Sequence, residues 1–195
     1  MLNRYDKSLE PSTLIQLSGG IDSAYVLWHW LKNNPNDICL VHHINLINHE
    51  GRNSVESKAV KDILNYLEQS GMGNYIYLEN TFDYGNLSFI IKDVEVCGFH
   101  LGLIIRNPRW HIKEILLPIY GHETKREAVR RKLVDLVSYQ KKVLLTYPLM
   151  GRNKGDVMAE MPKELLNLCW YCRTPKNSQP CGTCKTCKEV EKYKK

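Results

Sequence analysis

Short apolar runs alternate along the chain with longer segments in which apolar residues recur every three or four positions. The short runs predict buried strands, and they cover residues 13–17, 38–46, 75–78, 115–120 and 143–149. The longer segments have the period of a helix, and they cover residues 24–31, 53–69, 94–104 and 123–137. Strand and helix therefore alternate along most of the chain.

This alternation predicts an α/β protein with a parallel sheet and helices on both faces, because parallel strands need crossover connections. Ligands of such sheets bind at the carboxyl ends of the strands, near the switch point. Residues 18–23 directly follow the first predicted strand. From Lys163 the periodicity gives way to a cysteine-rich tail. We therefore predict an α/β domain over residues 1–162 and a cysteine-rich segment over residues 163–195.

The third and fourth predicted helices carry more specific expectations. In the third, Gly98 and Gly102 lie beside the apolar face and would permit close packing against a neighbour. In the fourth, Val129, Leu133 and Leu136 are expected to face the core. The lysines and arginines of the fourth helix are interpreted as a solvated face, with a nucleic-acid surface as the alternative.

Composition narrows the class of protein without setting its function. The chain has 195 residues, of which 43% are hydrophobic and 25% charged, as in ordinary globular proteins. No apolar run reaches the ~18 residues that span a membrane, and the first residues lack the apolar stretch of a secretory signal. We therefore expect no membrane partner and a cytoplasmic location. The formal net charge of +6 permits an anionic partner such as a nucleotide or tRNA, but does not demand one.

The segment that joins the first strand to the first helix has the sequence LSGGIDS, residues 17–23. Its two glycines let the backbone approach an anion closely, and the following helix N-terminus supplies partial positive charge. Its two serines add hydroxyl donors. Asp22 would repel a phosphate, so we expect it to cap the helix or to act through a bridging Mg²⁺. The segment has neither the Walker A nor the G-x-G-x-x-G spacing, so we predict a phosphate-binding loop of another type.

Residues 18–23 are similar to the SGGxDS signature of the PP-loop ATP pyrophosphatases. The resemblance implies a Rossmann-like fold of the adenine nucleotide alpha hydrolase type. In this family the pyrophosphate of ATP is held so that an acid can attack the α-phosphorus, with Mg²⁺ as cofactor. The resemblance implies catalytic roles for Ser18, Asp22 and Ser23. It also implies that the nucleotide is contacted by Leu17, Ser18, Gly19, Gly20, Asp22 and Ser23.

Four cysteines near the C-terminus follow the spacing C-x8-C-x2-C-x2-C: Cys172, Cys181, Cys184 and Cys187. Linked C-x-x-C steps can wrap a tetrahedral ion, and four thiolates leave no open position, which is typical of structural Zn²⁺. An iron–sulfur cluster is the alternative, while disulfides and free thiols fit this spacing in a reducing compartment less well. Cys169 is interpreted as a spare thiol, and Cys39 and Cys97 as small core residues.

The cysteine spacing resembles the zinc site of 7-cyano-7-deazaguanine synthases. Residues 148–154 are similar to the P-L-x-x-x-x-K segment of these enzymes, and residues 52–59 match their R-x-x-x-E-x-x-A spacing. After the fourth strand the chain departs from the family, since only Gly121 remains of its G-V-N-x-x-D stretch. The resemblance implies a catalytic role for Lys154 and contacts to nucleotide or substrate from Arg52 and Gly121, with a solvated surface charge as the alternative for Lys154 and Arg52.

This family makes a nitrile from 7-carboxy-7-deazaguanine and ammonia, releasing AMP and pyrophosphate. The carboxylate attacks ATP, ammonia opens the acyl adenylate to an amide, and a second ATP activates the amide oxygen. The resemblance therefore implies ATP, Mg²⁺ and Zn²⁺ as cofactors, a deazapurine acid and ammonia as substrates, and a homodimer. His42, His43 and His49 follow the second strand and are candidates for the ligand pocket, with polar filler as the alternative.

Three other functions stay open. A related PP-loop ligase would attach a deazaguanine or another acid to a protein or nucleic-acid acceptor. A tRNA thiolase would need a redox-active cysteine or cluster beside the adenylate, and Cys97 is the only mid-chain candidate. A non-enzymatic nucleotide-binding zinc module would bind ATP without releasing pyrophosphate.

Overall fold

The protein is built around a five-stranded sheet. A computed structural model describes residues 10–87, 93–121 and 124–193. All strand pairs are parallel, and the order across the sheet is β3-β2-β1-β4-β5. The strands are β1 Thr13–Gln16, β2 Cys39–Ile47, β3 Tyr75–Asp83, β4 Glu114–Leu116 and β5 Leu144–Thr146. The five predicted strands and their parallel arrangement are confirmed, although β4 and β5 are shorter than the apolar runs suggested.

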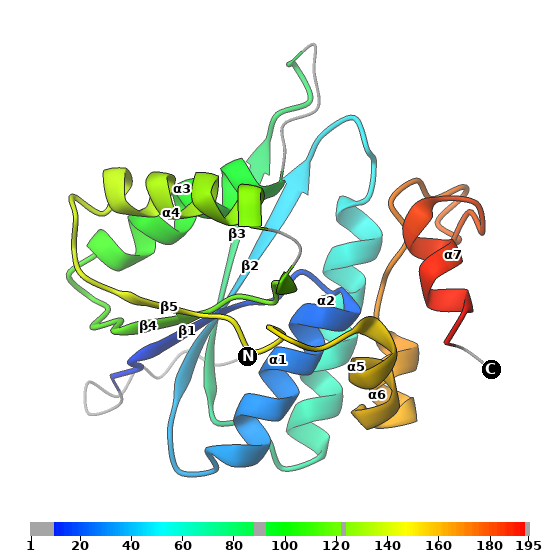
Figure 1. Ribbon diagram of the computed structural model, residues 1–195, viewed down its shortest axis with the longest axis horizontal. Coiled ribbons are helices and arrows are strands. Elements are labelled where there is room, and N and C mark those ends of the chain that lie inside the picture. The colour runs from blue at the N-terminus through cyan, green and yellow to red at the C-terminus, as the bar shows by residue number, and fades with distance from the viewer. Residues whose placement is uncertain (1–9, 88–92, 122–123, 194–195) are drawn as a thin grey trace.

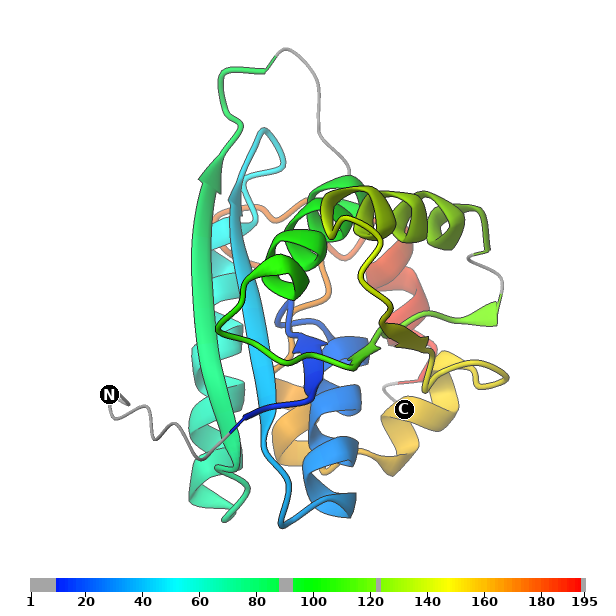
Figure 2. The same ribbon diagram turned by 90° about the vertical axis from the view of Figure 1, so that its left-hand side faces the viewer.

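Helices cover both faces of this sheet, as predicted (Figure 1). The described residues form α1 Ile21–Asn33, α2 Asn53–Gln69, α3 Asp93–Arg106, α4 Thr124–Val137, α5 Lys154–Glu160, α6 Lys163–Leu168 and α7 Lys185–Glu191. Buried side chains of α1 and α2 form one core cluster, which includes Ile15 of β1. Those of α3 form a second cluster on the opposite face, which includes Leu14. Figure 2 shows α3 and α4 in front of the sheet.

The topology creates a switch point between β1 and β4. The chain leaves β1 through α1 on one face and enters β4 from α3 on the other face. Crossovers that diverge in this way open a crevice at the carboxyl ends of the two central strands. Residues 17–20 and 117–121 follow these two strand ends, so the fold places the glycine loop at this crevice.

Of the three α4 residues predicted to face inward, only Leu133 packs on α3, where its Cβ would lie 3.0 Å from a Cβ added at Gly98. Val134 is fully buried, whereas Val129 and Leu136 are 42% and 72% exposed, so the expectation that they face the core is wrong. Gly102 explains the orientation, because a Cβ atom there would lie 2.6 Å from the Val137 Cβ. The small residues of α3 thus admit the row of α4 that contains Val137, and the expected close packing is confirmed. Glu123, the first residue of the predicted helix, lies outside the described residues.

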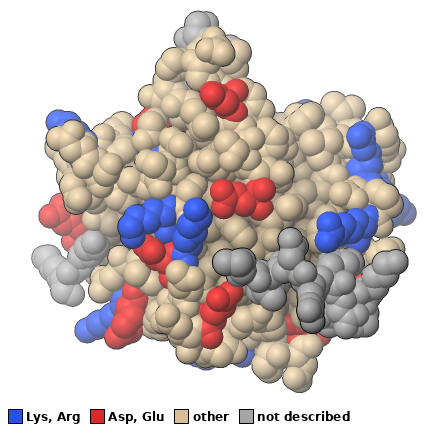
Figure 3. Space-filling model, turned by 180° about the vertical axis from the view of Figure 1, so that it is seen from behind, with Lys and Arg blue, Asp and Glu red and all other residues tan. Residues whose placement is uncertain are grey.

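The cysteine-rich segment packs against the α/β core. Leu165 of α6 and Val190 of α7 are fully buried and belong to the core cluster of α1 and α2. On the face opposite to that in Figure 1, lysines and arginines form separate groups with acidic side chains near them (Figure 3). No helix of the described part of the chain is long and apolar enough to cross a bilayer.

Candidate functional site

The loop after β1 has a backbone conformation that requires glycine. Gly19 has a φ of +79°, and a Cβ atom there would lie 2.7 Å from the carbonyl oxygen of Glu56. Gly20 is the N-cap of α1 and makes no side-chain cap. The first N–H groups of a helix have no intrahelical acceptor, so α1 begins with donors at the switch point. Asp22 lies within the first turn of α1 and is not its cap, contrary to one of the two roles expected for it.

The two loop serines hold the turn together. Ser23 is buried, and its Oγ accepts a hydrogen bond of 3.1 Å from the Ser18 N–H and donates one of 3.1 Å to the carbonyl oxygen of Gly20. The Oγ atoms of Ser18 and Ser23 are 3.0 Å apart. Ser18 is exposed. The loop is therefore ordered by Ser23 from inside, while Ser18 is available to a ligand.

Lys154 reaches the loop from the other end of the chain. Its Nζ atom donates to both carboxylate oxygens of Asp22, at 2.6 Å each. Lys154 is only 8% exposed and begins α5, where Asn153 and Asp156 form a reciprocal capping box that fixes the start of the helix. The Tyr120 hydroxyl donates to the same carboxylate at 2.6 Å. The switch point thus brings together α1, the segment after β4 and α5 around one carboxylate.

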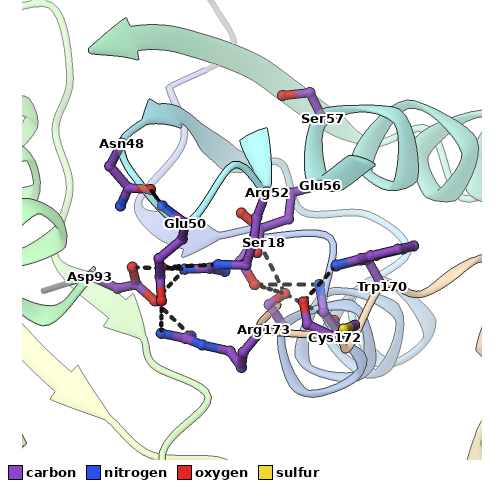
Figure 4. Close-up of polar contacts among 12 residues, drawn as sticks. Ser18, Asn48, Glu50, Arg52, Glu56, Ser57, Asp93, Trp170, Cys172 and Arg173 are labelled. Carbon is purple, nitrogen blue, oxygen red and sulfur yellow. Dashed lines mark hydrogen bonds and ion pairs between the residues drawn. The ribbon is translucent and has the colours of Figure 1, made fainter. Parts of the chain in front are cut away.

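Arg52 lies on the other side of the loop, in a cluster of carboxylates (Figure 4). It is buried and pairs with Glu50, Glu56 and, at 3.3 Å, Asp93. Burial raises the pKa of Glu56 to about 7, although the charge of Arg52 lowers this pKa. Arg173 adds a second cation, with its Nη1 atom 2.9 Å from Asp93 Oδ2. The charge of Arg52 is therefore neutralised by its own neighbours.

The segment that leads to the cysteines contacts the glycine loop directly. The Trp170 N–H donates to the carbonyl oxygen of Gly19 at 2.8 Å. The indole Nε1 of Trp170 donates to the carbonyl oxygen of Cys172 at 2.8 Å, and Arg173 follows at the carboxylate cluster. Figure 4 shows Trp170, Cys172 and Arg173 beside Ser18. The residues that flank the first predicted metal ligand therefore pack against the glycine loop and its neighbouring carboxylates.

The four predicted ligand cysteines converge. The Sγ atoms of Cys172, Cys181, Cys184 and Cys187 all lie within 4.8 Å of one another. Tetrahedral Zn²⁺ with bonds of ~2.3 Å would hold its sulfurs roughly 3.8 Å apart. The cluster therefore fits a metal such as zinc.

Polar groups around Cys181 favour its thiolate. The Cys184 N–H donates to its Sγ at 3.3 Å. Hydrogen bonds from Thr174 and Thr183 lower the pKa of Cys181 to about 5. A thiolate is the form of cysteine that binds metals.

Of the other cysteines, Cys39 and Cys169 belong to the core, as predicted for Cys39, whereas Cys97 is half-buried. Burial raises the pKa of Cys169 to about 12, and its Sγ donates to the carbonyl oxygen of Leu165 at 3.3 Å. Burial also raises the pKa of Cys97 to about 12, and the pKa of Cys39 is raised for the same reason. These three thiols are therefore poorly suited to nucleophilic or redox chemistry at neutral pH.

The remaining predicted site residues do not converge on the loop. His43 Nδ1 donates to the carbonyl oxygen of Leu17 at 2.9 Å, so this histidine helps to hold the backbone at the start of the loop in place. His42 points into the core on the α3 face, and His49 Nε2 lies 2.6 Å from the carbonyl oxygen of Leu87. Gly121 follows Tyr120, and a Cβ there would lie 3.3 Å from Met150 Sδ. Tyr120 itself was not predicted, since its run was assigned to a strand.

Fold and site together define a parallel α/β protein with a glycine loop at the switch point and a C-terminal cluster of four cysteines able to hold a metal such as zinc. Such a sheet is compatible with a PP-loop fold. Comparison with models of known protein families gave no match, and comparison with curated proteins gave none either. A function for this protein is therefore inferred from its own residues and their geometry.

Proposed function

We propose that this protein cleaves ATP between its α- and β-phosphates and transfers AMP to a carboxylate. The observation that carries the proposal is the contact of Lys154 and Tyr120 with Asp22, directly beside the Gly19 turn, whose positive φ requires glycine. A glycine turn and a helix N-terminus favour phosphate, and Lys154 is a buried cation within reach of the same place. We assign Arg52 a structural role beside the loop instead of a contact to phosphate, because three carboxylates already neutralise its charge.

Each residue has a physical role in the proposed step. The N–H groups at the start of α1 and the Ser18 hydroxyl bind the β- and γ-phosphates. Lys154 moves from Asp22 to the departing pyrophosphate and stabilises the charge that develops as the bond to the α-phosphorus breaks. Tyr120 keeps a hydrogen bond on Asp22 when Lys154 leaves. Mg²⁺, when bound by Asp22, would neutralise further phosphate charge.

The substrate that we propose is 7-carboxy-7-deazaguanine. Its carboxylate displaces pyrophosphate to form an acyl adenylate, and ammonia then displaces AMP to give the amide. The amide oxygen displaces pyrophosphate from a second ATP, and loss of AMP and a proton leaves the nitrile. The resemblance of the cysteine spacing and of residues 148–154 to the nitrile synthases supports this choice.

The state of the thiols argues against the alternative of a tRNA thiolase. Sulfur transfer by a free cysteine, as opposed to a metal cluster, needs an accessible thiolate beside the adenylate. Cys39, Cys97 and Cys169, the cysteines outside the metal cluster, all have pKa values raised by burial. A nitrogen nucleophile therefore suits this site better than a sulfur nucleophile.

The test is to incubate the purified protein with ATP, Mg²⁺, ammonium and 7-carboxy-7-deazaguanine and to identify the products by mass spectrometry. We expect AMP, pyrophosphate and a nitrile. Lys154→Met should lower the rate by roughly 10²–10³-fold, as removal of one transition-state donor does in other enzymes. Lys163→Met, at an exposed lysine, is the matched control and should retain the rate.

Other products would assign the protein differently. AMP that forms only when a protein or nucleic-acid acceptor is added would identify the ligase alternative. Formation of ADP and phosphate, or ATP binding with no turnover under any of these conditions, would contradict the proposal.

A further inference from the structure

The ends of α3 and α4 meet at a surface on the opposite edge of the sheet from the glycine loop. Each of these helices ends shortly before a strand begins, so their ends lie at the amino edge, whereas the loop lies at the carboxyl edge. Lys141 Nζ donates to the carbonyl oxygen of Ile105 at 3.2 Å and joins the turn after α4 to the last turn of α3. In Figure 1, the chain between α4 and β5 runs along the outer edge of the molecule, on the left of the view. We call residues 106 and 131–144 the helix-end surface.

Tyr139 projects from this surface in a backbone conformation that is unusual for tyrosine. Its φ is +54°, and that of Gln140 is +59°. The Lys141 N–H donates to the carbonyl oxygen of Ser138 at 3.4 Å, so the two residues between them are the centre of a tight turn in which asparagine and glycine are usual. Tyr139 is nevertheless 75% exposed, so burial does not compensate for this conformation. Strained backbone of this kind points to a functional contact.

Cations surround this turn. Arg106 lies over the Tyr139 ring, with its Cζ atom 4.7 Å from the ring centroid. The exposed cations of residues 124–144 include Lys125, Arg131, Lys132, Lys141 and Lys142. The same segment holds two acids, the half-buried Glu127 and the exposed Asp135. The helix-end surface is therefore strongly positive.

Helix electrostatics accounts for only part of this charge. Cations near the last carbonyl groups of a helix offset its dipole, which explains Arg106 and Lys141. That explanation does not extend to Lys132, which precedes the last turn of α4, or to Lys142, which lies between the turn and β5. An anionic partner would account for both of these lysines.

An open hollow lies beside the turn. Its volume is about 690 Å³, and Gln140, Lys142 and Leu144 are among its lining residues. Leu144 is 62% exposed, so the hollow has apolar as well as positive surface. Asp135 also lines the hollow. Its carboxylate would repel a phosphate but can accept a hydrogen bond from a ribose 2′-hydroxyl, so the hollow suits the sugar of RNA better than that of DNA.

We propose that the helix-end surface binds single-stranded RNA. One base stacks on the Tyr139 ring, Lys132 and Lys142 bind the neighbouring phosphates, and a 2′-hydroxyl donates to Asp135. Exposed aromatic rings beside cations bind single strands, because every base has a π-face and every linkage a negative charge. A duplex keeps its bases stacked inside and offers this surface mainly its backbone. This binding does not depend on the ATP chemistry at the loop, which lies at the other edge of the sheet.

The test is fluorescence anisotropy of the full chain with a labelled oligouridine of about 12 nucleotides, a length within the site sizes of single-strand binders. We expect a Kd between about 1 and 100 μM at physiological salt, which is typical of sequence-independent binding. An oligodeoxyuridine of the same length tests the 2′-hydroxyl, and an RNA duplex tests the need for unstacked bases. A polyglutamate peptide tests whether an acidic protein would serve as well. All three should bind more weakly than the oligouridine.

Replacement of Tyr139 separates binding from stability. Tyr139→Gly removes the ring but suits a φ of +54°, so this variant should unfold at no lower temperature than the wild type. Its affinity for oligouridine should nevertheless fall about tenfold, as loss of one stacked base does. Tyr139→Phe keeps the ring and is the matched control, which should retain the affinity.

Variants of the charged residues test the other contacts. Lys132→Ala/Lys142→Ala should flatten the slope of log Kd against log salt concentration by about 1.4, because each lost phosphate contact contributes about 0.7. Lys61→Ala/Lys163→Ala, at exposed lysines of α2 and α6, is the matched control and should leave the slope unchanged. Asp135→Ala should make the oligouridine and the oligodeoxyuridine bind equally.

Three results would overturn the inference. One is that oligouridine does not bind the folded wild-type protein at physiological salt. Another is that a folded Tyr139→Gly or Lys132→Ala/Lys142→Ala variant binds it as the wild type does. The third is that the duplex, the DNA or the polyglutamate peptide binds as tightly as the oligouridine. None of these results bears on AMP formation, which the same variants should retain because their substitutions lie away from the glycine loop.

Discussion

The candidate site is assembled from single residues that lie far apart along the chain and meet at the carboxylate of Asp22. The sequence marked Asp22 and Lys154 as candidates, but not that they touch, because 132 positions separate them along the chain. Tyr120 was missed because its aromatic ring fits an apolar strand pattern, and only the turn after β4 directs its hydroxyl to Asp22. Arg52 matched a family spacing, yet periodicity cannot show the three carboxylates that surround it.

Gly19→Ala should destabilise the protein by about 3 kcal/mol. The left-handed backbone costs about 1–2 kcal/mol for a residue with a Cβ, and here the Cβ would also lie 2.7 Å from the Glu56 carbonyl oxygen. Gly51→Ala is the matched control, because Gly51 has a φ of +63° with no atom within 4 Å of an added Cβ. Urea unfolding should show a loss for Gly51→Ala of about 1 kcal/mol only. Equal losses would mean that the Glu56 contact is unimportant.

At the scale of elements, the type of each helix was predictable but its rotation was not. Residues 124–137 form a helix as expected, and Leu133 packs on Gly98 as predicted, yet Leu136 faces solvent because Gly102 admits Val137 instead. The sequence also gave no sign that the segment before the cysteines lies on the glycine loop. That contact consists of a backbone N–H of Trp170 and a backbone oxygen of Gly19, which no side-chain pattern encodes.

On the proposal that the loop binds ATP and the cysteine cluster holds a metal, removal of that metal should weaken ATP binding about tenfold, within the range of typical couplings between sites. The reason is that Trp170 and Arg173, on either side of Cys172, contact the loop and the carboxylate cluster. Calorimetry with and without a chelator measures the change. Arg173→Ala should reproduce part of it, whereas Lys176→Ala, at another exposed cation of the same segment, should not. Unchanged affinity after verified metal loss would refute the coupling.

Acid should destabilise the protein through the buried histidines of β2 and α3. Burial lowers the pKa of His42 from 6.5 to about 4, and those of His43 and His100 in the same direction. The unfolded chain then binds more protons, so stability is full above pH 6.5 and falls as the pH drops towards 4. His42 alone accounts for about 3 kcal/mol. Urea unfolding from pH 7 to 4 should show a shallower loss for His42→Asn than for His29→Asn, and equal slopes would contradict this assignment.

For the whole molecule, alternation of apolar patterns was enough to predict the parallel sheet and the place of the loop. The position of the C-terminal segment was not predictable, because its few apolar residues have no period long enough to show a buried face. Leu165 and Val190 nevertheless complete the core on the side of α1 and α2. The division at residue 162 and the homodimer remain predictions.

Truncation after residue 162 should therefore destabilise the α/β part instead of releasing an independent domain. Leu165 and Val190 are fully buried, and each such side chain contributes about 1.5–3 kcal/mol. We expect the truncated protein to melt at a lower temperature than the full chain, and the double variant Leu165→Ala/Val190→Ala to show a similar loss. Lys188→Ala/Glu189→Ala, on the exposed side of α7, is the control. A truncated protein as stable as the full chain would show that the two parts fold separately.

The central place of β1 has a consequence for the way this protein is made. β1 leaves the ribosome before the other strands of the sheet, but its neighbour β4 is synthesised only after α1, β2, α2, β3 and α3. Because translation adds roughly 5–20 residues per second, the edge of β1 that pairs with β4 stays unpaired for several seconds. Nascent chains therefore expose an unpaired strand during translation, and newly synthesised protein should need chaperones more than the finished fold suggests.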